Sequence, residues 1–421
     1  MSHPLSSTHT QGKQREHNVQ NRSPYSSPAS SFSLILLLFF SSRFMMLMAF
    51  PPENLIFYGD YRHYFNLADM TRQGFYPFIH YWYEFPPIFP YLNIAVYTLA
   101  GQQLKNYVLL LAFILLLVEC GNLYLLYRLA FILHGLAQAI QIAWIYTALF
   151  IPIFFWLGNF DALTTFFILL GLYSLVKNKN KILAVALGLG AMVKFLPVIL
   201  LATVWRVRGV KKFLIYGVIT ILISLIILGP FTLINPWMTL ASLRAQASKS
   251  SYQTVWALID RNYTTGNLGD LPDHFDVDKA TQPINNPARI PTWLTFIPFG
   301  LFGLFVLTRP RVHPDANDIV IFTTLTFVVF LLWSPGWSPQ WQTFLIPLLL
   351  LALSEKRAVL FIIVLGFINF LEWPIIFSRG MNDLLPVTII ARTLIFVLLA
   401  YRLYLMLSPN NIHIGKQERD R

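Results

Sequence analysis

Apolar runs of about 15 to 20 residues recur along the chain between short polar segments, and runs of this length are typical of membrane-spanning helices. We expect about ten full spans from this pattern. They are residues 33–50, 107–127, 138–156, 161–176, 213–229, 291–307, 319–333, 341–354, 358–374 and 386–404. The pattern therefore predicts an all-α, polytopic helical membrane protein.

Two further apolar segments do not fit as simple crossings. Residues 87–101 begin at the Pro86-Pro87 pair, and a helix of about 15 residues covers only about 22 Å, so we predict a re-entrant or shallow segment. Residues 182–205, as a single crossing, would place the basic residues at their two ends on opposite sides of the membrane. A hairpin broken between Lys194 and Pro197 keeps both basic clusters on one side.

Basic residues concentrate in the short loops on one side of these predicted spans, which is the side that faces the cytoplasm in most membrane proteins. They include Arg128, Lys177, Lys179, Lys181, Arg206, Arg208, Lys211, Lys212, Arg309, Arg311, Lys356 and Arg357. The extracytoplasmic face then receives residues 51–106, 157–160, 231–290, 334–340 and 375–385. The polar tails, residues 1–31 and 409–421, are expected in the cytoplasm, and the first of them to be disordered.

Composition supports this assignment and excludes other classes of protein. The chain of 421 residues is 56% hydrophobic, with a mean hydropathy of +0.57. Its net charge of +12 lies mostly in the short loops, so it reflects membrane orientation and does not indicate nucleic-acid binding. The one cysteine, Cys120, lies inside an apolar run, which excludes a disulfide framework and a thiolate metal site.

The predicted loop 51–86 holds more charge than a connection between two spans requires. In a chain with only 12% charged residues, it contains Glu53, Asp60, Arg62, His63, Asp69, Arg72 and Glu84 among many aromatic residues. Asp60 follows the first span closely, and partial removal from water there would raise its pKa toward the range of a general base. The alternative is an aromatic belt at the membrane interface with a solvated Asp60.

Five sequence elements occur in a characteristic order. They are Gly74-Phe75-Tyr76-Pro77-Phe78, Tyr83-Glu84-Phe85-Pro86-Pro87, Gly158-Asn159-Phe160-Asp161-Ala162-Leu163, a small-residue helix that ends in Lys194 and Pro197, and Ser338-Pro339-Gln340-Trp341. This set resembles GT-C-type membrane glycosyltransferases, especially polyprenol-phosphate-mannose-dependent mannosyltransferases. The chain departs from that family at Asn159, where Gln is common, and at Phe160, where Asn is common.

The resemblance implies roles for individual residues. Asp60 is the candidate catalytic base, with Glu84 as an alternative base or as an orienting group. Lys194 is a candidate for the leaving phosphate, because an ammonium among apolar residues requires a partner. The alternative for Lys194 is a structural ion pair with Asp161. Asn159 and Asp161 begin a span, so helix capping and substrate contact are both open to them.

Other candidate substrate-binding residues are Arg62, His63 and Tyr83 in the first loop, and Gln340 and Trp341 in the late motif. Trp faces suit sugar stacking, although anchoring at the membrane interface is the more common role. The histidines show no spacing typical of a metal site, and we expect neither a metal nor another cofactor. We expect residues 231–290 to fold as a cap, because this segment is too long for a tight connection.

The resemblance implies an inverting transfer of a hexose, with mannose as the first candidate, from a polyprenyl-phosphate sugar to a glycan, lipid or protein acceptor. Residues 32–408 would form the catalytic membrane domain, with its site on the extracytoplasmic or lumenal side of the cell membrane or the endoplasmic reticulum. The rival hypothesis is a transporter or flippase of lipid-linked sugars. A transporter would collect polar groups at the membrane midplane, whereas here they gather near one face.

Overall fold

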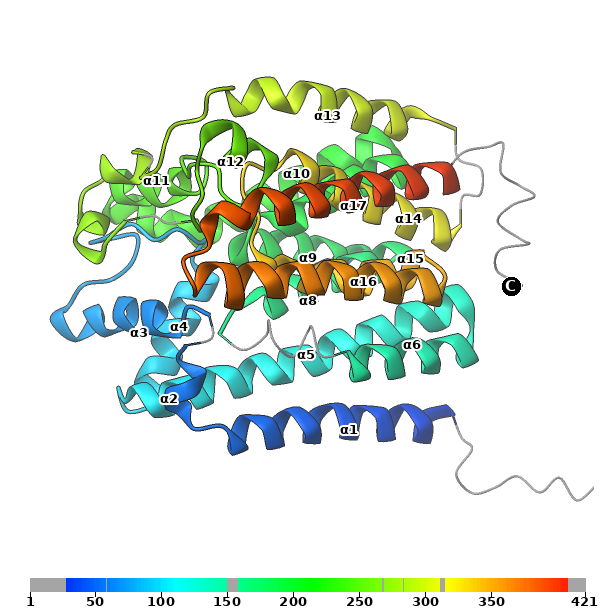
Figure 1. The fold of residues 1–421 in the computed structure, drawn as a ribbon, viewed down its shortest axis with the longest axis horizontal. Helices are drawn as coiled ribbons and strands as arrows, with labels where there is room; N and C mark the ends of the chain where they lie inside the picture. The colour runs from blue at the N-terminus through cyan, green and yellow to red at the C-terminus, as the bar shows by residue number, and fades with distance from the viewer. Residues whose placement is uncertain are drawn as a thin grey trace, which may run out of the picture.

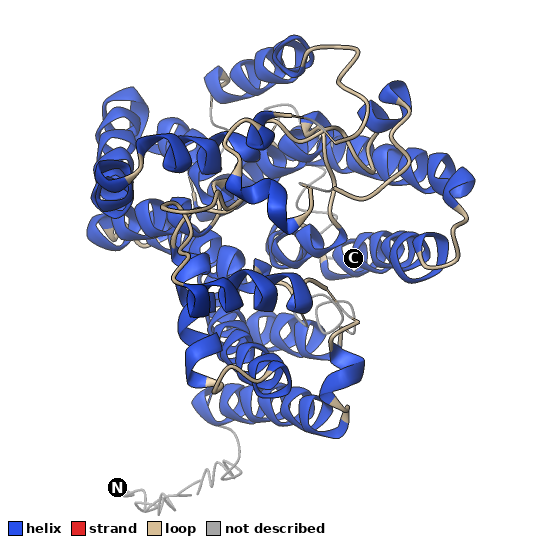
Figure 2. Cartoon of the chain, turned by 90° about the vertical axis from the view of Figure 1, so that its left-hand side faces the viewer, coloured by secondary structure: helices blue, strands red, loops and turns tan. Residues whose placement is uncertain are grey.

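The computed structural model describes residues 28–57, 59–149, 158–266, 269–282, 284–310 and 315–407. The longer helices are α1 (Pro28–Ala49), α4 (Ile88–Leu99), α5 (Leu104–His134), α6 (Leu136–Ala148), α8 (Asp161–Val176), α9 (Asn180–Val193), α10 (Leu200–Ile234), α13 (Thr292–Thr308), α14 (Ala316–Trp333), α15 (Gln342–Ala352), α16 (Glu355–Phe370) and α17 (Leu385–Met406). These described residues contain no β-strand, which confirms the all-α prediction (Figure 2).

Six described segments are long and apolar enough to cross a membrane. They are Ser31–Ala49, Leu104–His134, Leu196–Ile234, Ala316–Trp333, Glu355–Phe377 and Asn382–Met406. Shorter apolar helices are α4, α8, α9 and α13. A polytopic membrane fold is thus confirmed, while the number of full crossings stays a prediction. Most of the predicted tails, residues 1–27 and 408–421, and the end of the span at 138–156 lie outside the described residues.

The first helix starts earlier than its apolar run. Residues 28–31 were expected to belong to a disordered tail, but α1 begins at Pro28. Helix α1 and the predicted tail thus overlap by four residues, and the disorder of the tail stays a prediction. Proline is well suited to the first turn of a helix, because the amide hydrogen that it lacks has no partner there in any case.

The core is a set of antiparallel helices that run along the long axis of the molecule (Figure 1). Helix α5 contacts α1, α6 and α8, and α8 contacts α9 and α15. Every residue of α15 is buried, as expected for a helix that is apolar all round. The short helices α2 (Pro52–Leu55), α3 (Tyr61–Asp69), α11 (Pro236–Ala245) and α12 (Val255–Asp260) gather at one end of this bundle (Figure 1).

The predicted hairpin in residues 182–205 is confirmed. Helix α9 ends at Val193, Lys194 is extended, and a short 3₁₀ helix, η2 (Leu196–Ile199), leads into α10. The returning chain brings Arg208 back to the start of α9, where its guanidinium donates to the side chains of Asn178 and Asn180. Gly209, with φ of 78°, then turns the chain again, so α10 is two helices joined at a kink.

The segment 231–290 forms a cap at the end of the bundle where α3 lies. It consists of the end of α10, helices α11 and α12, and two 3₁₀ turns, η3 (Leu271–Phe275) and η4 (Lys279–Thr281). Trp82 of the first loop binds the cap, because its indole donates to the backbone oxygens of the cap residues Asp273 and Asp276. The same indole stacks on the ring of His274 at 3.9 Å. The first loop and the cap therefore enclose a common space.

Candidate active site

A cavity of about 360 Å³ lies between the first loop, the cap and the helix ends beneath them. Segments far apart in the sequence contribute its lining, which consists of Gly59, Asp60, His63, Glu84, Phe85, Asn159, Lys194, Gln246, Lys249, Tyr252, Gln253, Thr265, Gly266, Gly269, Ser338, Pro339, Gln340, Trp341 and Trp373. The first loop thus brings its charges to the same space as the motifs near residues 159, 194 and 340. The predicted topology placed these segments on or near the same face of the membrane.

Asp60 is placed by a close approach of two backbone segments. Its amide donates to the oxygen of Gly158 at 3.0 Å, directly beside Asn159. Gly59 has φ of 75°, and a Cβ there would lie 2.6 Å from that same oxygen, so only glycine fits. The contact fixes Asp60 at the start of α3, with its side chain exposed to the cavity.

The carboxylate of Asp60 has no cationic partner among the described ion pairs. It accepts one hydrogen bond, from the hydroxyl of Tyr64 at 3.2 Å. The surrounding protein and the negative charge of Glu84 raise the pKa of Asp60, and His63, Tyr64 and Lys249 only partly offset them. A carboxylate with a raised pKa is suited to accept a proton.

Glu84 has a lowered pKa, in contrast to the raised pKa of Asp60. Its Oε2 lies 2.7 Å from the ammonium of Lys249 and accepts from the amide of Gln246 at 3.1 Å. Burial alone would raise the pKa of Glu84, but the charges of Lys249 and His63 outweigh burial and lower it. The two carboxylates therefore differ, because Glu84 is paired and ionised while Asp60 is free to take a proton.

The position of Lys194 is compatible with both roles that the sequence left open. Its ammonium lies 2.8 Å from Oδ1 of Asp161, so the structural ion pair exists. The same ammonium lies 5.4 to 5.6 Å from the ring centroids of Phe85, Phe160 and Trp341, and Lys194 lines the cavity. Asp161 lies outside the cavity lining, and its side chain is 3% exposed. Asp161 thus holds the lysine from behind, and the ammonium faces the cavity.

Asn159 does not cap α8. The residue at the cap position is Phe160, with no side-chain hydrogen bond to the helix, and Asp161 is the first helical residue. The capping interpretation of Asn159 is therefore wrong. Asn159 lines the cavity instead, where its amide is available to a ligand. Asp161 in the first turn still interacts favourably with the positive end of the helix.

Arg62 and Tyr83, both predicted to bind substrate, lie outside the cavity lining. Arg62 is exposed. It lies between Asp60 and His63 in the sequence, but not on the face of α3 that carries those two residues. Tyr83 is buried in a cluster with Phe78 and Tyr81 and does not reach the cavity. Three further arginines of the first loop and the cap, Arg72, Arg244 and Arg261, are also outside the lining.

The sequence predicted a cap, but not which of its residues line the cavity. Lys249 and Gln246 meet Glu84, and the cap residues Tyr252, Gln253 and Thr265 line the cavity together with Trp373. Lys249 and its partner are 165 positions apart in the sequence, so no local pattern joins them. The only available signal was the unusual length of the segment and its position on the same predicted face.

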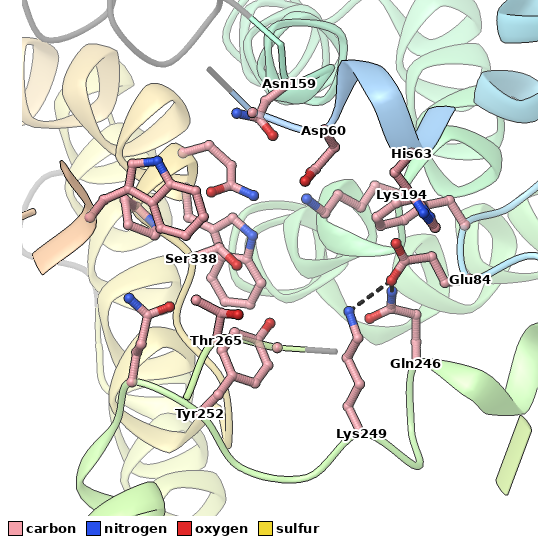
Figure 3. Close-up of a pocket in the computed structure, with 18 of the residues that line it drawn as sticks. Asp60, His63, Glu84, Asn159, Lys194, Gln246, Lys249, Tyr252, Thr265 and Ser338 are labelled. Carbon is pink, nitrogen blue, oxygen red and sulfur yellow. Dashed lines mark hydrogen bonds and ion pairs between the residues drawn. The ribbon is translucent and has the colours of Figure 1, made fainter. Parts of the chain in front are cut away.

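The cavity has two chemically different walls (Figure 3). We call one the charged wall, which consists of Asp60, His63, Glu84, Lys194 and Lys249. We call the other the neutral wall, on which Figure 3 shows Tyr252, Thr265 and Ser338. We include the lining residues Gln253 and Trp373 in it, because Gln253 follows Tyr252 and its side chain contacts Glu372, the neighbour of Trp373. Among the described residues, no group of three or more His, Cys, Asp and Glu side chains is arranged to hold a metal ion. Acid–base and cationic groups on one wall therefore face hydroxyl, amide and aromatic groups on the other.

Fold and cavity together define a polytopic helical membrane protein with a cavity lined by charged groups at one end of its bundle. The family model of glycosyltransferase family 87 matches residues 85–335, more than half of the chain. The protein belongs to glycosyltransferase family 87, a family of GT-C-type membrane glycosyltransferases. No curated protein matches the chain.

This membership confirms the predicted GT-C-type glycosyltransferase and supports an enzyme over the alternative of a transporter. The matched segment contains Asn159, Lys194 and Lys249. It begins after Asp60 and Glu84 and ends before Gln340. The interpretation of these three residues therefore depends on the resemblance of the motifs and on the geometry of the cavity, and not on the family match.

Proposed function

We propose that the enzyme transfers a hexose, with mannose as the first candidate, from a polyprenyl-phosphate sugar to an acceptor hydroxyl. The donor class comes from the resemblance of the ordered motifs, and the cavity supports it through two ammonium groups that could face a phosphate. The acceptor would be a glycan, a lipid or a protein. The observation that carries this proposal is an unpaired carboxylate of raised pKa, Asp60, in the same cavity as Lys194.

In the proposed reaction, Asp60 accepts the proton of the acceptor hydroxyl while the acceptor oxygen attacks the anomeric carbon of the donor sugar. The bond from that carbon to the phosphate oxygen breaks, and the polyprenyl phosphate leaves with its electron pair. Lys194 stabilises the negative charge that develops on this phosphate. One displacement inverts the anomeric configuration. Glu84, already paired with Lys249, is better suited to orient groups than to act as the base.

The proposed orientation places the cavity on the extracytoplasmic or lumenal side of the membrane. Basic residues at the other end of the bundle support it, including Arg208 beside the start of α9 and Lys356 at the start of α16. Loops rich in lysine and arginine face the cytoplasm in most membrane proteins. The compartment would be the cell membrane, or the endoplasmic reticulum membrane in a eukaryote.

The direct test uses the purified protein in lipid nanodiscs with polyprenyl-phosphate mannose labelled in the sugar and a membrane extract as the source of acceptors. We expect the label to leave the lipid fraction and appear in a new product. Polyprenyl-phosphate glucose tests the choice of sugar in a parallel reaction. Label that stays on both lipids, with a protein that remains folded, would contradict the proposed donor class.

A further inference from the structure

A buried ion pair outside the cavity joins the cap to two core segments. The carboxylate of Glu372 and the guanidinium of Arg392 are in direct contact, and the two residues are 0% and 2% exposed. The other carboxylate oxygen of Glu372 accepts from the hydroxyl of Thr388 at 2.7 Å. The guanidinium of Arg392 also donates to the backbone oxygen of Gln253 and lies 5.1 Å from the ring centroid of Trp337. The proposed transfer reaction uses none of these contacts.

The pair supports a cavity residue that has an unusual backbone conformation. Gln253 has φ of 52°, a left-handed conformation that non-glycine residues rarely adopt and that costs free energy unless its surroundings enforce it. Arg392 binds its backbone oxygen, and Glu372 accepts from its side-chain amide at 3.5 Å. The preceding residue is held as well, because the amide of Tyr252 donates to the oxygen of Pro335 at 3.1 Å. Gln253 is therefore fixed on the cavity wall in both backbone and side chain.

Glu372 also fixes a second residue of the neutral wall. Trp373 is its direct neighbour in η6 (Leu371–Phe377), a π-helical segment, and π-helical turns are frequent at functional sites. Glu372 is buried and Trp373 lines the cavity, so anchoring the acid sets the position of the indole. One ion pair thus positions an amide and an aromatic ring on the same wall.

An amide and an indole that line the same cavity suit a neutral sugar ring. Amide groups donate and accept hydrogen bonds with hydroxyls, and an indole offers a flat apolar face with one donor. The neutral wall carries no charged side chain that would attract a phosphate. We propose that Gln253 and Trp373 bind a neutral hexose ring of the acceptor, and that the Glu372–Arg392 pair is a positioning device for them. The assignment to the acceptor rests on the proposed function, which gives the charged wall to the donor phosphate.

Energetics also favour a positioning role over a purely stabilising one. Removing two charges from water is costly, and apolar replacement of a whole buried ion pair is often neutral or stabilising. Loss of only one partner leaves a buried charge without compensation and is strongly destabilising. The informative variant is therefore the double substitution Glu372→Met with Arg392→Met. It removes both charges together and preserves the side-chain volume approximately.

The test measures sugar binding without any transfer reaction. Saturation-transfer NMR on the full-length protein in nanodiscs reports the binding of methyl α-mannoside, methyl α-glucoside and methyl α-galactoside. Binding of a polyprenyl phosphate without sugar is measured in parallel. We expect Gln253→Ala to weaken the preferred hexoside by about 3- to 10-fold, the effect of one lost hydrogen bond, and Trp373→Ala to weaken it at least as much. Polyprenyl phosphate affinity should stay the same in both variants.

The matched control for Trp373→Ala is Trp293→Ala, since Trp293 is 68% exposed on α13 and outside the cavity lining. It should leave both affinities unchanged. The Glu372→Met, Arg392→Met double variant should fold, keep its polyprenyl phosphate affinity and lose hexoside affinity to the same extent as Gln253→Ala.

Three outcomes would overturn the inference: no hexoside binding by the wild-type protein, unchanged hexoside affinity in both cavity variants, or equal losses of hexoside and polyprenyl phosphate in the double variant. Failure of the wild-type protein to bind polyprenyl phosphate would instead contradict the proposed donor. In that case a loss of hexoside affinity in Gln253→Ala and Trp373→Ala, but not in Trp293→Ala, would still support the sugar subsite.

Discussion

The ion pair of Lys194 with Asp161 and that of Lys249 with Glu84 have nearly equal lengths, 2.8 and 2.7 Å, but they face the cavity differently. Asp161 is behind the lysine and outside the cavity lining, so the first pair presents only its cation. Both members of the second pair line the cavity. Lys194, whose acid lies outside the lining, presents its positive charge to a ligand. Lys249 lines the cavity together with its acid, so it mainly affects the electrostatic potential there. Lys194 is therefore the better candidate to meet a phosphate.

Asp60 differs from both paired acids, and its substitution should have the largest effect. Asp60→Asn removes the proposed base while keeping size and hydrogen-bonding capacity, and we expect the transfer rate to fall by about 10²- to 10⁴-fold. Binding of polyprenyl phosphate should be retained, because the lost group acts on the acceptor hydroxyl. The measurement is single-turnover transfer from labelled donor.

The control for this variant is Asp69→Asn at the other end of α3. The side chain of Asp69 is 29% exposed, pairs with Arg72 at 2.9 Å and accepts from the hydroxyl of Tyr97. An asparagine oxygen can still accept the bond from Tyr97, and an ion pair with the exposed Arg72 contributes little to stability. Its transfer rate should stay within about twofold of the wild type. An Asp60→Asn protein with a rate equal to this control would exclude Asp60 as the base.

The next largest effect should distinguish the two lysines. Lys194→Met removes the cation proposed to stabilise the leaving phosphate, and we expect the rate to fall by about 10²- to 10³-fold. Polyprenyl phosphate should also bind more weakly. Asp161→Asn keeps the lysine but loosens its position, so the loss of rate should be smaller. Single-turnover rates and phosphate affinity measure both effects.

Lys181→Met is the matched control, because Lys181 lies on α9, the helix that ends just before Lys194, and is exposed. It should change neither quantity. If Lys249→Met weakened polyprenyl phosphate binding and Lys194→Met did not, the assignments of the two lysines would have to be exchanged.

Lys194 is on an element that the sequence could predict, whereas Lys249 is in the cap, whose contacts it could not. Apolar runs and basic clusters predicted the helical fold and even the hairpin at Lys194, because both follow from local periodicity and charge. Asp60 and His63 are three positions apart at the start of α3, a spacing that places side chains on one helix face. Arg62 is between them and lies outside the cavity lining, which the same periodicity would have indicated.

The cap could not be predicted in the same way. Its helices are short, and its contributions depend on contacts with distant segments, such as Lys249 with Glu84 and Gln253 with Arg392. Gln253 is also in a conformation that its residue type disfavours, so its position follows from tertiary contacts and not from propensity. Periodicity and motif order thus predict the groups on continuous helices and loops, and they miss the groups that a separate segment folds over them.

The smallest expected effect is a shift of the pH profile. It tests how the Lys249–Glu84 pair affects the pKa of Asp60. The pKa of Asp60 is raised, so transfer should fall, as pH is lowered, at a higher pH than for an ordinary aspartate. Glu84 contributes to this rise and Lys249 opposes it. Glu84→Gln should therefore move the acidic limb of kcat/KM to lower pH. Lys249→Met should move it to higher pH, because it removes an attractive charge and leaves Glu84 uncompensated. Limbs that moved in the same direction in the two variants, or did not move, would show that this pair does not control the ionisation of Asp60.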